Sequence, residues 1–149
     1  MNAILFPGQG SQIVGMGSEF YNNFPFVKQI FEEADSKLNY KISKIILDGP
    51  DDKLKLTQNT QPAILIVSYA IFSVLKKEFN FDFKSTKFFA GHSLGEYTAL
   101  VCSQSLEFND ALFLLFERGK SMQEAVPVGK GGMIAIPVSY THLTLPTKA

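Results

Sequence analysis

The sequence predicts an α/β fold, because two strand-like runs each lead into a glycine-rich loop. Residues 86–90 are short and apolar, residues 91–95 spell Gly-His-Ser-Leu-Gly, and residues 94–101 favour a helix. Residues 3–6 form the second apolar run and enter the glycine-rich segment 7–12 at once. A strand that enters a glycine-rich loop is a common place for chemistry at the edge of an α/β sheet.

Between the two runs the sequence predicts helices. The first starts near Pro25, after polar residues that suit a helix cap, and one face is apolar at helical spacing: Val27, Ile30, Phe31, Ala34 and Leu38. Residues 42–47 favour a second short helix that ends at the turn residues 48–50, and Asp51 can cap a further short turn through Leu54.

A long buried helix is expected next. Residues 57–61 are polar and lead into it, with Pro62 at its first position. It is apolar nearly all round, which is typical of a helix enclosed in the core. Residues 80–84 suit a loop.

After the strand at 86–90 and its helix, Asn109 or Asp110 is expected to cap a last helix that runs to about Glu124. Its inward face would carry Leu112, Leu115, Phe116, Gly119 and Met122. A linker follows, and residues 133–136 resemble the start of another strand.

Composition excludes several classes of function. The chain has 149 residues, which suits one domain or part of a larger one, and Lys+Arg and Asp+Glu number 14 each. This balance indicates neither a nucleic-acid partner nor an anionic membrane. A single cysteine, Cys102, excludes a disulfide framework, and no signal or membrane-spanning segment is evident, so a cytoplasmic location is expected. No metal site and no cofactor are predicted.

The Gly-x-Ser-x-Gly pattern at 91–95 has two interpretations. It fits a nucleophile elbow, in which a strained turn lifts the hydroxyl of Ser93 clear of a sheet edge. The plainer interpretation is a glycine-rich turn between a strand and a helix. The segment 7–12 is neither a phosphate loop nor a dinucleotide fingerprint, so it is either a tight turn or a place where the Gln9 backbone approaches a ligand. Arg118, taken alone, suits a solvated or ion-paired surface position.

Four motifs occur together: residues 6–12 (FPGQGSQ), 61–63 (QPA), 91–97 (GHSLGEY) and 118–119 (RG). With these in place the chain resembles the malonyl-CoA:acyl carrier protein transacylase family of acyltransferases, over about residues 3–136. The resemblance implies an α/β-hydrolase-like large subdomain, truncated, with an incomplete parallel sheet flanked by helices. Residues 1–125 would belong to that subdomain, 126–136 to a linker and the first strand of a ferredoxin-like subdomain, and 137–149 to a non-native tail.

The resemblance also implies a reaction and its residues. The family transfers a malonyl group from malonyl-CoA to the phosphopantetheine thiol of acyl carrier protein, through a malonyl ester on serine. Ser93 matches the nucleophile, and Gln9 and Leu94 match the backbone N–H donors of the oxyanion hole. Arg118 matches the arginine that binds the malonyl carboxylate. Gln61 lies in a family motif, but the resemblance assigns it no role.

One departure bears on activity. The family's catalytic histidine comes after the last residue of this chain, whose histidines are His92 and His142. His92 is expected to point away from Ser93, and His142 lies in the tail. The chain is therefore expected to be the N-terminal half of the enzyme and inactive, while the full-length enzyme would be a monomer.

Three other functions remain open on the sequence alone. One is an acyltransferase domain of a polyketide synthase, which shares the motifs. The second is a serine hydrolase with the same elbow, although such an enzyme needs neither Arg118 nor the loop around Gln9. The third is a non-catalytic module that binds carrier protein or coenzyme A.

Overall fold

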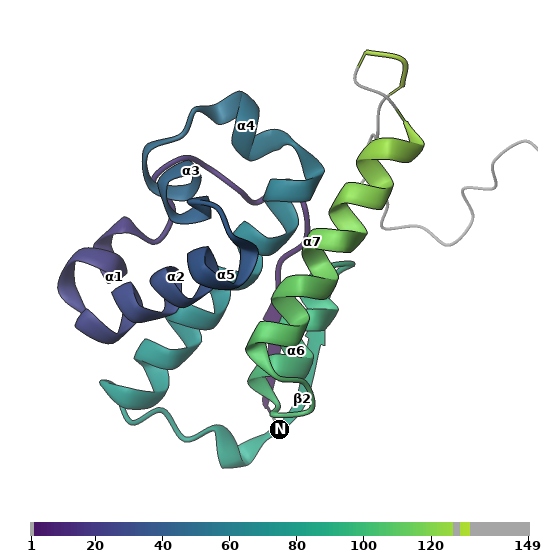
Figure 1. Cartoon of the computed structure of the whole chain (residues 1–149). Coiled ribbons are helices and arrows are strands. Elements are labelled where there is room, and N and C mark those ends of the chain that lie inside the picture. Colours follow the sequence, from purple (N-terminus) through teal and green to yellow (C-terminus); the bar gives the residue numbers. More distant parts are fainter. Residues whose placement is uncertain (1, 127–128, 132–149) are drawn as a thin grey trace, which may run out of the picture.

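The structure is a computed structural model that describes residues 2–126 and 129–131, and it confirms the predicted α/β class (Figure 1). Two strands, β1 (Asn2–Phe6) and β2 (Thr86–Gly91), pair in parallel, with Ile4 opposite Phe89 and Phe6 opposite Gly91. They form the one sheet of the described residues. The strand expected at 133–136 lies outside those residues.

Helices make up most of the chain. Between the strands come α1 to α5 and a short 3-10 turn, and after β2 come α6 and α7. Their bounds are Ser18–Asn23, Pro25–Leu38, Ile42–Asp48, Asp51–Lys55, Thr57–Lys77, Phe83–Ser85 for the turn, Gly95–Cys102 and Phe108–Ala125. Figure 1 shows α1 to α4 grouped on one side, with the sheet, α6 and α7 on the other, and α5 contacts both groups.

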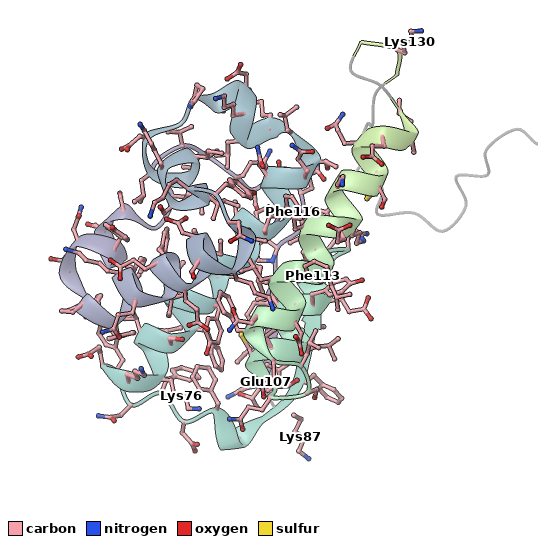
Figure 2. All side chains as sticks on the ribbon, in the orientation of Figure 1. Lys76, Lys87, Glu107, Phe113, Phe116 and Lys130 are labelled. Atoms are coloured by element: carbon pink, nitrogen blue, oxygen red, sulfur yellow. The ribbon has the colours of Figure 1, made fainter. Side chains whose placement is uncertain are left out.

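Helix α5 is the centre of the hydrophobic core, as its sequence predicts. Most of its residues from Thr57 to Val74 are buried, and its apolar side chains join those of α2, α3, α6 and α7 in one cluster. Phe116, labelled on α7 in Figure 2, packs its ring against that of Tyr40, which follows α2, at a centroid distance of 5.8 Å. Burial of most of helix α5 explains why its sequence is mainly apolar after Pro62.

The start of α5 corrects the prediction for Pro62. The helix begins at Thr57, so Pro62 lies inside it rather than at its first position. The polar residues before Pro62 have partners that stabilise an earlier start: the hydroxyl of Thr60 donates to the carbonyl oxygen of Leu54 at 2.6 Å, and the side-chain amide of Asn59 donates to that of Lys53 at 2.9 Å. Side-chain contacts with the preceding helix, α4, therefore outweigh the local signal of the proline.

Two other local expectations are wrong, and one helix was not predicted. Helix α1 has no fully buried residue, although Phe20 and Tyr21 are partly buried against the core. Asp51 is the first residue of α4 rather than its cap, which is Pro50. Asn109 lies within α7, whose cap is Glu107, and its amide donates to Glu33 of α2. Asp51 forms an ion pair with Lys55 within α4, whereas Asn109 contacts another helix, so neither side chain caps its own helix.

Among the described residues, the sheet packs on one face only. Phe6 is buried with Phe72 of α5 and with Ala99 and Cys102 of α6. The opposite face carries Leu5, which is 76% exposed, and Phe88, which is 55% exposed. Alternation along each strand thus separates a covered face from an open one.

Helix α7 approaches the first turn of α5 at Gly119. A Cβ on Gly119 would lie 2.6 Å from the Cα of Gln58 and 2.6 Å from the carbonyl oxygen of Thr57, both backbone atoms that no rotamer change can move. Only glycine permits this approach. The approach sets the position of the adjacent Arg118 relative to α5.

Gly119→Ala is expected to lower the free energy of unfolding by about 1–3 kcal/mol, because the added methyl group separates α7 from α5. Urea denaturation followed by circular dichroism measures the change. Lys120→Ala is the control, since Lys120 is exposed and its loss should cost no more than about 0.5 kcal/mol. Equal stabilities for the two variants would contradict the close contact.

Candidate active site

The turn between β2 and α6 holds Ser93 in a strained conformation. β2 ends at Gly91 and α6 begins at Gly95, so three residues make the turn. Ser93 has φ of 55°, in the left-handed region that non-glycine residues seldom adopt. Its side chain is exposed. The conformation costs on the order of 1–3 kcal/mol, and such strain is concentrated at functional sites.

Both glycines of the pattern are required by close packing. A Cβ on Gly91 would collide with the backbone of Gly95 and Glu96. A Cβ on Gly95 would lie 2.5 Å from the carbonyl oxygen of Phe6 and 2.7 Å from that of Pro7. The first contact folds the turn on itself, and the second brings the turn against the end of β1.

The loop after β1 lies beside the turn, as neighbouring parallel strands dictate. The N–H of His92 donates to the carbonyl oxygen of Phe6 at 3.2 Å. A Cβ on Gly8 would lie 2.5 Å from Nδ1 of His92 and 2.7 Å from its carbonyl oxygen, so the imidazole lies against Gly8. This places Gln9, the next residue, at the same edge of the sheet as Ser93.

Two backbone N–H groups remain at this edge as donors. The N–H groups of Gly95, Glu96 and Tyr97 are bonded to carbonyl oxygens of the turn at 2.9–3.1 Å. Within residues 2–126 and 129–131, no hydrogen bond uses the N–H of Gln9 or of Leu94. Free N–H groups at the same edge of a sheet as a serine can serve as donors to an oxyanion.

The structure brings Arg118 of α7 to Ser93. Its Nη2 donates to the Ser93 hydroxyl oxygen at 3.1 Å, and its Nη1 donates to the side-chain oxygen of Gln61 at 2.5 Å. Arg118 is half-buried, and Gln61 is fully buried in α5. Taken alone, Arg118 suited a surface position; its guanidinium instead joins two segments at the serine.

Thr57 is a second residue that contacts the site and that the sequence did not identify. Its hydroxyl donates to the side-chain oxygen of Gln9 at 2.6 Å, and its backbone N–H donates to that of Gln123 on α7 at 3.3 Å. A signal was available, because Thr57 and Gln61 lie four residues apart and therefore on one face of a helix. Pro62 concealed it, since it suggested that the helix starts after both residues.

Other chemistry finds little support in the described residues. Burial raises the pKa of the Cys102 thiol to about 12, against the opposing effect of Lys76, so this cysteine is a neutral core residue rather than a nucleophile. In the part of the chain that the structure describes, no three His, Cys, Asp or Glu side chains form a group able to hold a metal ion. No helix in residues 2–126 and 129–131 has the length and apolar character needed to cross a membrane.

Comparison with known proteins connects this geometry to one family. Residues 4–145 match the acyl transferase domain family. Over 134 residues the chain is 48% identical to the malonyl CoA-acyl carrier protein transacylase of Bacillus subtilis (strain 168) and 46% identical to that of Escherichia coli (strain K12). Each alignment covers 90% of this chain, but only 41% and 42% of the relatives. The chain thus spans about two fifths of the length of the curated relatives it matches.

Solved structures give the same result. The acyl-carrier-protein-S-malonyltransferase of Bartonella henselae superposes with a TM-score of 0.80 at 45% identity, covering 85% of this chain and 40% of that one. The malonyl-transacylase of a type II polyketide synthase system, solved in complex with its acyl-carrier protein, superposes with a TM-score of 0.77 at 46% identity, with coverage of 84% and 40%.

Proposed function

Because this chain belongs to the acyl transferase domain family, we propose that it carries the nucleophile and the carboxylate-binding arginine of a malonyltransferase. The enzyme would move a malonyl group from malonyl-CoA to the phosphopantetheine thiol of an acyl carrier protein, in fatty acid biosynthesis. The relatives at 46–48% identity are named malonyl CoA-acyl carrier protein transacylases, which supports this proposal.

In the proposed first half-reaction, the Ser93 hydroxyl oxygen attacks the thioester carbonyl carbon of malonyl-CoA. The serine proton passes to a base, the C–S bond breaks, and coenzyme A leaves as a thiol. The N–H groups of Gln9 and Leu94 would hold the transient oxyanion, a contact for which one donor is typically worth about 10²–10³ in kcat. In the second half-reaction the carrier-protein thiol attacks the malonyl ester, and Ser93 recovers its proton.

The observation that carries the proposal is the 3.1 Å contact between Arg118 Nη2 and the Ser93 hydroxyl. A guanidinium at that distance can bind a carboxylate attached to the acyl group that Ser93 receives. A hydrolase that cleaves uncharged esters has no use for such a cation. This contact therefore favours the malonyltransferase over the serine hydrolase.

In the part of the chain that the structure describes, no group that contacts Ser93 can serve as the base. Within the described residues, the hydroxyl of Ser93 has Arg118 as its side-chain partner, and the imidazole of His92 packs on Gly8. His142 lies outside the described residues. A positioned general base is typically worth ~10²–10⁴ in rate, so we expect the 149-residue chain alone not to turn over.

The test uses a chimaera, in which the 134 matched residues of this chain replace the matched segment of the Bacillus subtilis relative. We expect the chimaera to transfer malonyl groups to purified carrier protein and the 149-residue chain not to do so. A folded chimaera without transfer would contradict the proposed function. Transfer by the chain alone, lost in His142→Ala, would identify His142 as the base and contradict the expected inactivity.

Organisation beyond the described core is part of the same proposal. We retain residues 1–125 as the large subdomain, 126–136 as a linker with the first strand of a ferredoxin-like subdomain, and 137–149 as a non-native tail. The complete enzyme is proposed to be a cytoplasmic monomer. Light scattering during size-exclusion chromatography of the chimaera gives its mass directly.

A further inference from the structure

The first turn of α5 contacts the site at two separate points. Thr57 reaches the loop that carries one proposed oxyanion donor, and Gln61 reaches the guanidinium proposed to bind the malonyl carboxylate. We propose that Thr57 and Gln61 are positioning residues. Thr57 would hold the oxyanion donor that malonyl-CoA and acetyl-CoA both need, and Gln61 would orient the arginine that selects malonyl-CoA by its carboxylate. This inference rests on the proposed function, because it assigns residues to that reaction.

Thr57 connects the Gln9 loop to helix α5 through a side-chain hydrogen bond. Its side chain is buried, whereas Gln9 is exposed. The remaining side-chain hydrogen bonds of this loop, among described residues, are local: the Ser11 hydroxyl donates to the carbonyl oxygen of Gly8, and the Gly10 N–H donates to Gln12. The hydroxyl of Thr57 therefore anchors the Gln9 side chain to a fixed helix.

This loop needs such an anchor. Gln9 lies between two glycines, and Gly10 has φ of 108°, which only glycine adopts readily. A loop with this freedom has no intrinsic reason to keep the N–H of Gln9 directed at one point. A displacement of about 1 Å in a group that stabilises a transition state can cost on the order of 10²-fold in rate.

Gln61 fixes the other group. Its amide is fully buried, its oxygen accepts from Nη1 of Arg118, and its nitrogen contacts the sulfur of Met122 at 3.4 Å. With Nη1 held, Nη2 is directed at Ser93. A planar guanidinium binds a carboxylate through two hydrogen bonds only when its plane is set, and Gln61 sets that plane.

The two contacts belong to one rigid unit. Thr57 and Gln61 are one helical turn apart, and α7 is locked to that turn by the Gln123 contact with Thr57 and by the missing Cβ of Gly119. The effects are separable, however. An oxyanion forms with any acyl group, whereas a free carboxylate is present on malonyl and absent from acetyl.

Thr57→Val in the chimaera is expected to lower kcat about 10-fold or more for malonyl-CoA and acetyl-CoA alike, with little change in KM, because the lost contact acts in the transition state. Thr57→Ser keeps the hydroxyl and should restore the rate. Thr60→Val is the matched control, since the Thr60 hydroxyl bonds backbone oxygens of Leu54 and Leu56. It should change stability and leave kcat unchanged.

Gln61→Met, which keeps the volume and removes the acceptor, is expected to lower kcat/KM for malonyl-CoA about 10-fold more than for acetyl-CoA. Rapid-quench mass spectrometry of acylated Ser93 measures the rate of acylation by each of the two thioesters. Equal losses for both thioesters in Gln61→Met would overturn the role of Gln61. An unchanged kcat in Thr57→Val, or a kcat that Thr57→Ser does not restore, would overturn the role of Thr57. An unaltered chimaera that is folded yet inactive would contradict the proposed function instead.

Discussion

Ser93→Ala in the chimaera is expected to abolish the malonyl adduct that malonyl-CoA otherwise leaves on the protein. The covalent route needs an oxygen at this position, and Ser93 is the exposed residue that the strained turn holds at the end of β2. Transfer to carrier protein should fall by at least about 10⁴-fold, as when the nucleophile of a comparable serine enzyme is removed. Intact-mass analysis detects the adduct as one malonyl mass.

Ser103→Ala is the matched control. Ser103 follows α6 at the end opposite Ser93, and its hydroxyl donates to the carbonyl oxygen of Leu100. The length of α6, about 1.5 Å for each of its residues, separates it from the site. This variant should acquire the malonyl adduct at the normal rate. Retention of the adduct in Ser93→Ala would show that another residue is the nucleophile.

The turn around Ser93 could be predicted because its physics is local. The pattern of Gly91, Ser93 and Gly95 specifies a positive φ and two close contacts, and the structure shows all three. Parallel pairing then places the loop of Gly8 and Gln9 beside it, in agreement with the role that the family resemblance implies for Gln9. These features need only neighbours in the chain or the strand that is paired next to them.

Contacts between distant segments could not be predicted in the same way. Whether Arg118 faces water or Ser93 depends on how closely α7 approaches α5, and this is decided where Gly119 meets Gln58. The polar start of α5 is likewise stabilised by α4, by Gln9 and by α7. The sequence placed the start of this helix at Pro62, because the local preference of proline is visible in a sequence, whereas contacts with distant segments are not.

The position of Arg118 is expected to decide how strongly the enzyme prefers malonyl over acetyl groups. Nη1 is held by the buried Gln61, and Nη2 lies 3.1 Å from the oxygen that would carry the malonyl ester. When a malonyl carboxylate binds at this site, Arg118 would replace its hydrogen bond to the serine hydroxyl with a charge-assisted pair of hydrogen bonds to the carboxylate. An acetyl group has no carboxylate, so Arg118 contributes to only one of the two substrates.

Arg118→Ala is therefore expected to cost malonyl transfer about 2–5 kcal/mol, the usual effect of removing one partner of a desolvated charge pair. This equals about 30- to 5,000-fold in kcat/KM, while acetyl transfer should change little. Arg118→Lys should recover only part of the loss, because an ammonium keeps the charge without the planar pair of donors. Lys120→Ala, which removes a cation from the exposed side of the same helix, should affect neither substrate. An equal loss of malonyl and acetyl transfer in Arg118→Ala would show that the arginine maintains the contact between α5 and α7 and does not bind the substrate.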